Sequence, residues 1–148
     1  MAEESFMSMA IEQAKAAAMR SEVPVGAVLV YQNQVIARAG NETRALNDVT
    51  AHAEILAIRR GGIKLSQERL IDCDLYVTLE PCAMCAGAIS FARIRRLYIG
   101  TEDEKGGGVI NGGRFFNQPT CHHAPDVYSG FQSDVCAQIL KDFFNRQR

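Results

Sequence analysis

Two cysteines stand three positions apart in the middle of the sequence, Cys82 and Cys85 in the stretch "LEPCAMC" that covers residues 79–85. Such a pair can form a redox disulfide, supply half of a closed zinc site, or supply part of an open, catalytic metal site. Pro81 favours a helix start beside the pair, and the positive end of a helix stabilises the thiolate form that binds metal. The spacing suits metal binding but does not by itself choose among the three alternatives.

The three alternatives need different partners elsewhere in the chain. A redox pair of the thioredoxin type needs that fold's strand–helix context, which the predicted order of helices and strands does not provide. A closed zinc site usually shows a second Cys or His pair, and the only candidate is "CHH" at residues 121–123. An open site needs one further protein ligand, and His52 in "TAHAE" is the best one.

Glu54 follows His52 by two positions and carries a carboxylate that can act as general acid and base beside a metal. The order His-x-Glu and then Pro-Cys-x-x-Cys matches the known signature of zinc-dependent nucleobase deaminases. Residues two apart on a regular helix face nearly opposite ways. One of the two must therefore lie in an irregular first turn, which Thr50 as N-cap would allow. The motif predicts hydrolytic deamination with Glu54 moving the protons, and it leaves the substrate undefined.

Helical and extended patterns alternate along the chain in an order that can position these residues. Apolar residues at helical spacing predict a helix from about residue 4 to residue 20, and "VPVGAVLVYQNQVIARAGN" predicts a hairpin with its turn at "QNQ". Helices are then predicted for "TAHAEILAIRR", "PCAMCAGAISFAR" and "SDVCAQILKDFF", and strands for "DLYVTLE", "RRLYIGT" and a short piece near "DVYSG". This order predicts an α/β fold with a mixed sheet, in which right-handed crossovers bring the starts of helices 51–60 and 82–92 together.

Length and composition favour one domain spanning residues 1–148 in a soluble, cytoplasmic protein. The chain has 47% hydrophobic and 22% charged residues, and no stretch approaches the ~20 apolar residues of a membrane span. Its five cysteines indicate reduced thiols or metal ligands in such a compartment. The net charge of −1 gives no global signal for nucleic acid, so any RNA binding must come from a local basic patch. Three basic runs are candidates: Arg59, Arg60, Lys64 and Arg69; Arg93, Arg95 and Arg96; and Lys141, Arg146 and Arg148.

Four stretches of the chain resemble the bacterial tRNA-specific adenosine deaminases, a family of the cytidine/deoxycytidylate deaminase superfamily. They are "VPVGAVLV", "TAHAEI", "LYVTLEPCAMCAGAI" and "ILKDFF", and the likeness runs from about Phe6 to Phe144. The resemblance implies an α/β/α sandwich with a mixed five-stranded sheet, as in cytidine deaminase. It also implies a homodimer that converts the wobble adenosine of a tRNA anticodon to inosine.

Residue by residue, the resemblance makes His52, Cys82 and Cys85 the ligands of one zinc ion per chain and Glu54 the proton shuttle. These assignments agree with the interpretation of the motif as an open catalytic site. The chain therefore is expected to be a single zinc-dependent deaminase domain.

The resemblance also implies three substrate-binding residues. Asn41 matches a residue that hydrogen-bonds the flipped base, although a turn Asn after Gly40 is the interpretation without the resemblance. Asp103 matches a position near the ribose of the target nucleotide, and a solvated charge is an equal alternative. Phe143 and Phe144 match aromatics close to the RNA. Because adjacent helical residues point about 100° apart, one of the two is expected to belong to the core. At most one meets a base, and Phe144 is assigned that role.

Two other interpretations of the function remain open. A deaminase of a free base, nucleoside or nucleotide (guanine, cytosine, cytidine or deoxycytidylate) would use the same zinc site. A non-catalytic, zinc-stabilised binding module would require Glu54 to be idle. An RNA enzyme needs basic residues to converge around the mouth of its pocket, whereas a deaminase of small molecules does not.

Overall fold

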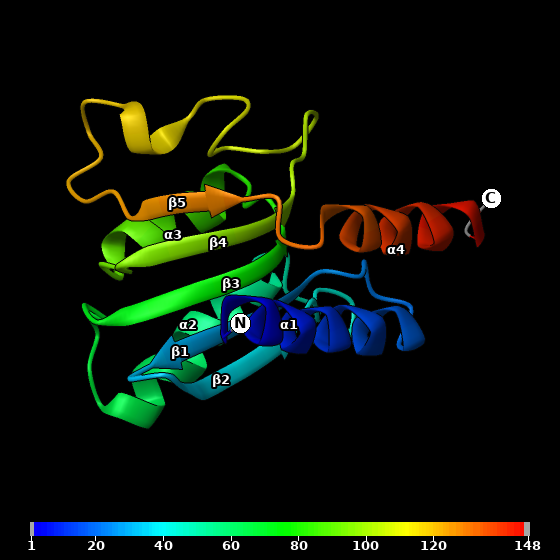
Figure 1. Ribbon diagram of the computed structural model, residues 1–148, viewed down its shortest axis with the longest axis horizontal. Coiled ribbons are helices and arrows are strands. Elements are labelled where there is room, and N and C mark those ends of the chain that lie inside the picture. Colours follow the sequence, from blue (N-terminus) through cyan, green and yellow to red (C-terminus); the bar gives the residue numbers. More distant parts are fainter. Residues whose placement is uncertain (1, 147–148) are drawn as a thin grey trace.

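The computed structural model describes residues 2–146, which form one five-stranded sheet between two layers of helices (Figure 1). The strand order is β2-β1-β3-β4-β5; β1 pairs antiparallel with β2 and β3, and the β3–β4 and β4–β5 pairs are parallel. The predicted three-layer α/β/α sandwich with a mixed five-stranded sheet is confirmed. In chain order the elements are α1 (Ala2–Met19), β1 (Gly26–Tyr31), β2 (Gln34–Gly40), α2 (Ala53–Leu65), β3 (Cys73–Leu79), α3 (Ala83–Phe91), β4 (Arg96–Thr101), the 3-10 helix η1 (Phe115–Asn117), β5 (Asp126–Ser129) and α4 (Ser133–Arg146).

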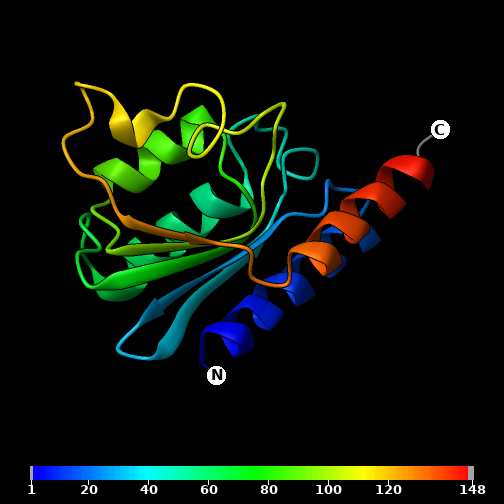
Figure 2. The same cartoon turned by 45° about the horizontal axis from the view of Figure 1, so that its top comes forward.

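Both faces of the sheet are buried, each under its own pair of helices. Alternate side chains of a strand point to opposite faces. Accordingly Leu75 and Leu97 pack into the core with α2 and α3, whereas Tyr76 and Tyr98 pack with α1 and α4. Figure 2 shows the two helix pairs on opposite sides of the sheet. The near-continuous apolar pattern of the central strands follows from this double burial.

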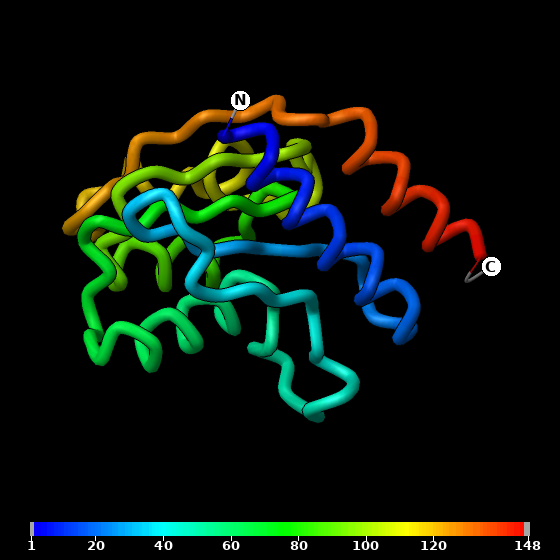
Figure 3. Tube along the Cα trace, turned by 60° about the horizontal axis from the view of Figure 1, so that its bottom comes forward, coloured from blue at the N-terminus to red at the C-terminus, as the bar shows by residue number. Residues whose placement is uncertain are grey.

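Helix α1 lies directly on β1 because the residues between them are small. Ala10 and Ala14 are fully buried on the inner face of the helix, and Gly26 opens the strand beneath them. A Cβ at Gly26 would overlap the backbone of both alanines, so only glycine permits this close approach. Helix α4 runs beside α1 on the same face (Figure 3).

The hairpin β1–β2 turns at Gln32 and Asn33, as its sequence predicts. Both residues have positive φ, 50° and 63°, as a two-residue turn between twisted antiparallel strands requires. Two longer loops follow other strands: residues 41–52 project from the body between β2 and α2 (Figure 3), and residues 102–125 pass over α3 with η1 as their only helical turn. Both loops begin where β2 and β4 end. Within residues 2–146, no helix is long and apolar enough to cross a membrane.

Candidate active site

Three metal-ligating side chains meet where α2 and α3 begin. One ligand atom each from His52, Cys82 and Cys85 lie within 4.8 Å of one another. The Sγ atoms of Cys82 and Cys85 are 3.7 and 3.5 Å from Nδ1 of His52. The structure therefore brings together the three predicted ligands, although His52 lies 30 and 33 positions before the two cysteines.

The cluster is assembled by the residues that precede each helix. His52 is the N-cap of α2 and Cys82 the N-cap of α3, both with extended backbone (ψ 154° and 176°) and neither using its side chain as a cap. The prediction that Thr50 caps α2 is wrong, because the Thr50 hydroxyl donates a hydrogen bond to Asp48 instead. Since His52 lies outside the regular helix, it and Glu54 can face the same side despite their spacing.

The donor set and its protonation fit a divalent cation of the zinc type. Hydrogen bonds from Cys85 and His52 lower the pKa of the Cys82 thiol to about 4, so it is a thiolate at neutral pH. The hydrogen bond to Cys82, together with burial, raises the pKa of Cys85, which holds the shared proton. The hydrogen bond to Cys82 likewise raises the pKa of His52. A cation would take the place of these protons, and one imidazole with two thiolates is a common zinc donor set with an open fourth position.

Glu54 lies in the first turn of α2, with only 3% of its surface exposed. It lines the same cavity of about 270 Å³ as His52 and Cys82. Burial, which disfavours the charged form, raises the pKa of its carboxyl to about 7. A group of that pKa takes up and releases protons readily at neutral pH.

Asn41 lines the cavity and is also tied to the start of α2. Its side-chain Oδ1 accepts a hydrogen bond of 2.8 Å from the backbone N–H of Ala53. This bond fixes which end of the amide is oxygen, so the NH2 group is the part that can donate to a bound molecule. Asn41 is 8% exposed and is not the solvated turn residue that its position after Gly40 suggests.

The other two predicted substrate residues lie further out. Asp103 lines the cavity and also a larger groove of about 650 Å³ beside it. Phe144 lines only that groove, half exposed, whereas Phe143 is buried. The expectation that one of the two aromatics belongs to the core is confirmed. Val23, Leu79 and Gly106 line both spaces, so the groove continues directly from the cavity.

Two buried carboxylates at the cavity, Glu22 and Glu80, are not predicted from the sequence. Glu22 accepts hydrogen bonds from the backbone N–H groups of Arg44 and Ala45, and Glu80 accepts them from the loop after β4. Each is at most 2% exposed. The available signal was an acidic residue at the start of an apolar run in "EVPVGAVLV" and within one in "YVTLEPC", because an acidic side chain buried with such a run must find partners.

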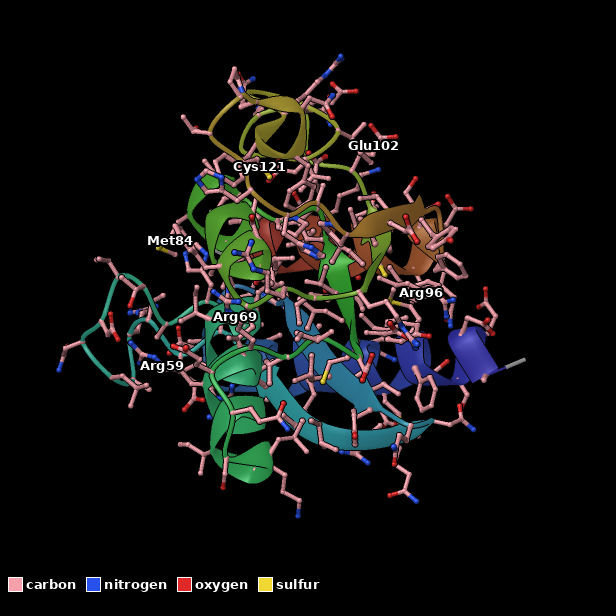
Figure 4. All side chains as sticks on the ribbon, turned by 90° about the vertical axis from the view of Figure 1, so that its left-hand side faces the viewer. Arg59, Arg69, Met84, Arg96, Glu102 and Cys121 are labelled. Atoms are coloured by element: carbon pink, nitrogen blue, oxygen red, sulfur yellow. The ribbon has the colours of Figure 1, made fainter. Side chains whose placement is uncertain are left out.

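The basic run at residues 93–96 lies away from the cavity. Arg96 begins β4, whereas Thr101 at the other end of that strand lines the groove, a separation of about 16 Å along the strand. Figure 4 faces this far end of the sheet, where Arg69 and Arg96 are labelled. Within one chain this run does not surround the cavity, and Arg148 lies outside the described residues. Basic residues nearer the site are Arg20, whose guanidinium donates to the Asn41 carbonyl, and Lys105, which lines the groove.

The "CHH" segment does not join the metal cluster. Cys121 contacts the hydroxyl of Ser90 and the carbonyl of His123, and the His123 ring lies 2.7 Å from the carbonyl of Ile94. Among residues 2–146, His52, Cys82 and Cys85 form the only group of three or more such side chains close enough to hold a metal. A closed zinc site completed by residues 121–123 is therefore not formed. Cys73, Cys121 and Cys136 are free thiols, in agreement with the expectation of reduced cysteines.

Comparison with known proteins agrees with this geometry. The MafB19-like deaminase family model matches residues 1–148. A tRNA-specific adenosine deaminase from Agrobacterium fabrum is 64% identical over 97% of this chain and 94% of its own length. Another from Rickettsia typhi is 43% identical over 96% and 97%.

Solved structures give the same result at the level of the fold. A structure from a study of A-to-I editing by tRNA:A34 deaminases at the wobble position of transfer RNA superposes with a TM-score of 0.91 at 65% identity, covering 92% of this chain and 99% of that one. A guanine deaminase from Nitrosomonas europaea shares the fold, with a TM-score of 0.79 at 22% identity over 95% of this chain and 83% of that one. The extent and identity of the matches to the tRNA deaminases settle the family. The chain belongs to the tRNA-specific adenosine deaminase family.

Proposed function

We propose that the protein is a zinc-dependent enzyme that hydrolyses adenosine to inosine at the wobble position of a tRNA anticodon. The observation that carries this proposal is the cavity in which the carboxyl of Glu54 lies beside His52 and Cys82. Family membership supplies the substrate class, since relatives that cover 97% and 96% of this chain are named tRNA-specific adenosine deaminases.

His52, Cys82 and Cys85 would hold the zinc ion. Zinc with three protein ligands lowers the pKa of a coordinated water from ~15.7 to about 7 and so supplies the nucleophile at neutral pH. The two helix N-termini favour the thiolates that bind the ion. Both ligand-bearing segments belong to the buried core, so the cluster is held in place before substrate arrives.

Glu54 moves the protons of the reaction. It takes one proton from the attacking water and delivers it to a ring nitrogen of the base. It then takes the remaining proton from the hydroxyl that the water has become and passes it to the amino group, which leaves as ammonia. One water is consumed, the carbon–nitrogen bond breaks, and a carbonyl takes its place. Glu54 ends the cycle in the same protonation state in which it began. One buried carboxyl can therefore serve both proton transfers.

Asn41, Asp103 and Phe144 are proposed to bind the substrate. The NH2 of Asn41 would donate to an acceptor on the flipped base, and Asp103 would lie near the ribose. The groove beyond the cavity gives flanking nucleotides a place to lie, and Phe144 offers an aromatic face for stacking there. A loop nucleotide is already unpaired, so moving it into the cavity costs less than extracting a base from a duplex.

A panel of substrates tests the proposal. The protein should deaminate an anticodon stem-loop far faster than free adenosine, cytidine, cytosine or guanine, and that activity should fall as salt rises because phosphate contacts release counterions. Rapid turnover of free guanine or cytosine with an unedited stem-loop would replace the RNA proposal by that of a small-molecule deaminase.

The Asn41→Asp variant should separate the two roles of this side chain. Aspartate keeps an oxygen for the Ala53 N–H and removes the donor, so we expect kcat/KM for the stem-loop to fall ~10- to 100-fold while the contact to α2 is kept. Asn41→Ala should lose the same activity and also about 1 kcal/mol of stability. Initial rates and thermal melts of both variants measure this. A full-rate Asn41→Asp enzyme would leave Asn41 with only the structural role of accepting the hydrogen bond from Ala53.

We also propose that the single domain of residues 1–148 works as a cytoplasmic homodimer. Support comes from apolar side chains on the outer surface of the α2–α3 layer: Phe91 is 75% exposed, Ile63 is 80% exposed and Met84 is 38% exposed. Ile89, on the same helix as Met84 and Phe91, is buried and does not contribute to this surface.

The Phe91→Glu variant should therefore shift the protein to monomers, since a charge at the centre of an apolar contact opposes association. Light scattering at micromolar concentration measures the change, and Ile71→Glu, also exposed but on the loop before β3, is a matched control. A wild-type protein that is already monomeric would contradict the homodimer.

A further inference from the structure

Glu80 is a buried carboxylate that takes no part in the proposed proton transfers. Its two oxygens accept five hydrogen bonds: from the backbone N–H of Asp103 (3.0 Å), Val109 (3.1 Å), Ile110 (2.9 Å) and Asn111 (2.9 Å), and from the Asn111 side-chain NH2 (2.7 Å). Every donor belongs to residues 103–111. A carboxyl group surrounded only by donors acts through its ionised form.

This same segment forms one wall of the active-site cavity. Of this segment, Asp103 and Gly106 line the cavity. Glu54, Asn41 and Thr43 line it from other parts of the chain. The backbone N–H of Gly108 donates to the carbonyl of Pro81, 2.8 Å away, so the segment also rests on the start of the metal-binding helix. The position of the wall is thus tied to residues 80–82.

Glycines allow the wall to approach this closely. A Cβ at Gly107 would overlap the carboxylate of Glu80, and a Cβ at Gly108 would lie 2.7 Å from the backbone nitrogen of Ala83. By contrast, a Cβ at Gly113, further along the loop, would meet nothing within 4 Å. The glycine-rich sequence at this point therefore fits the packing around Glu80.

We propose that Glu80 is a positioning residue for the deamination: its carboxylate holds residues 103–111 so that the Asp103 wall of the cavity is preformed relative to Glu54 and the metal ligands. The inference rests on the proposed function. Between β4 and η1 the segment has no regular secondary structure. Hydrogen bonds to the Glu80 carboxylate therefore order its backbone, as the hydrogen bonds of a helix or strand would elsewhere. A preformed wall spares each binding event the cost of ordering the loop.

The Glu80→Gln variant tests this, with Asp74→Asn as its matched control. Asp74 is also buried but lies near the start of β3, where it binds Arg95, whereas Glu80 directly follows the end of that strand. Glutamine turns one acceptor oxygen into a donor facing other donors. Hydrogen exchange at the amides of Asp103, Val109 and Ile110 should accelerate at least about tenfold in Glu80→Gln and stay unchanged in Asp74→Asn.

Kinetics then separate a positioning role from a merely structural one. In Glu80→Gln, kcat/KM for the stem-loop should fall ~10- to 100-fold with the zinc content unchanged, as expected for a misplaced cavity wall. Adding Asp103→Ala should cost much less in this background than in the wild type, because the carboxylate acts through that wall. When Asp103→Ala is combined with Asp74→Asn instead, the factors by which the two substitutions lower kcat/KM should multiply.

Several results would overturn the inference: unchanged exchange at the three amides, unchanged kcat/KM, or fully multiplicative effects of Glu80→Gln and Asp103→Ala. If Glu80→Gln does not fold, Glu80→Asp gives the same test with Asp74→Asn as control, because aspartate is one methylene shorter and cannot reach the same five donors. Failure of the proposed function is distinguishable, because the wild type would then leave the stem-loop unedited while the exchange pattern still reported whether Glu80 holds the wall.

Discussion

The Glu54→Gln variant should keep its metal and its fold and lose deamination by ~10²- to 10⁴-fold or more, since one general acid–base group is worth about that much and here it serves several steps. Glutamine has the same shape but cannot exchange protons. Because Glu54 is buried, a neutral amide is also easier to accommodate than a carboxylate, so the melting temperature should not fall.

Initial rates on the anticodon stem-loop and metal analysis of the purified variant measure this together. Glu68→Gln, an exposed position after α2, is the control and should behave as the wild type. Turnover within a few-fold of the wild type in Glu54→Gln would remove this carboxylate from the mechanism, whereas loss of the metal would mean that Glu54 helps to hold it.

The Cys82→Ala/Cys85→Ala double variant should lose both the zinc and all measurable deamination. Only His52 of the three ligand side chains remains, and one imidazole does not retain zinc against dilution. Wild-type protein should contain about one zinc per chain, and Cys121→Ser, which changes a half-buried thiol outside the cluster, should contain the same amount.

Elemental analysis after exhaustive dialysis is the measurement. Zinc retained in the double variant, or lost in Cys121→Ser, would move the metal to another part of the chain. Zinc loss with a normal melting temperature would further show that the cluster is a catalytic site and not the support of the fold.

The sequence allowed prediction of those features whose cause is local. Apolar spacing is enough to place α1, and the order of helices and strands is enough to predict a mixed sheet with α2 and α3 on one face. The meeting of His52 with Cys82 and Cys85 follows from that topology, because both ligand-bearing segments open helices at the same edge.

What escaped prediction depends on contacts between distant residues. Glu80 bonds to Asn111, 31 positions away, and Asn41 to Ala53 across a projecting loop. Neither partner can be chosen before the sheet order and the course of residues 101–111 are known. The basic run at Arg93, Arg95 and Arg96 illustrates the same limit, because charge spacing does not tell which end of a strand faces the cavity. The cap of α2 was misassigned because Asp48, and not the helix, takes the Thr50 hydroxyl.

The most direct test of the account uses one anticodon stem-loop that carries adenosine at the wobble position and at a second loop position, incubated with wild-type protein and with Glu54→Gln. Inosine is read out position by position, and ammonia is measured in the same reaction. The account predicts inosine at the wobble position alone, with an equal amount of ammonia, from the wild type and almost none from the variant. Inosine at neither position while the zinc-loaded wild type deaminates free guanine or cytosine, or equal editing by the Glu54→Gln variant, would contradict it.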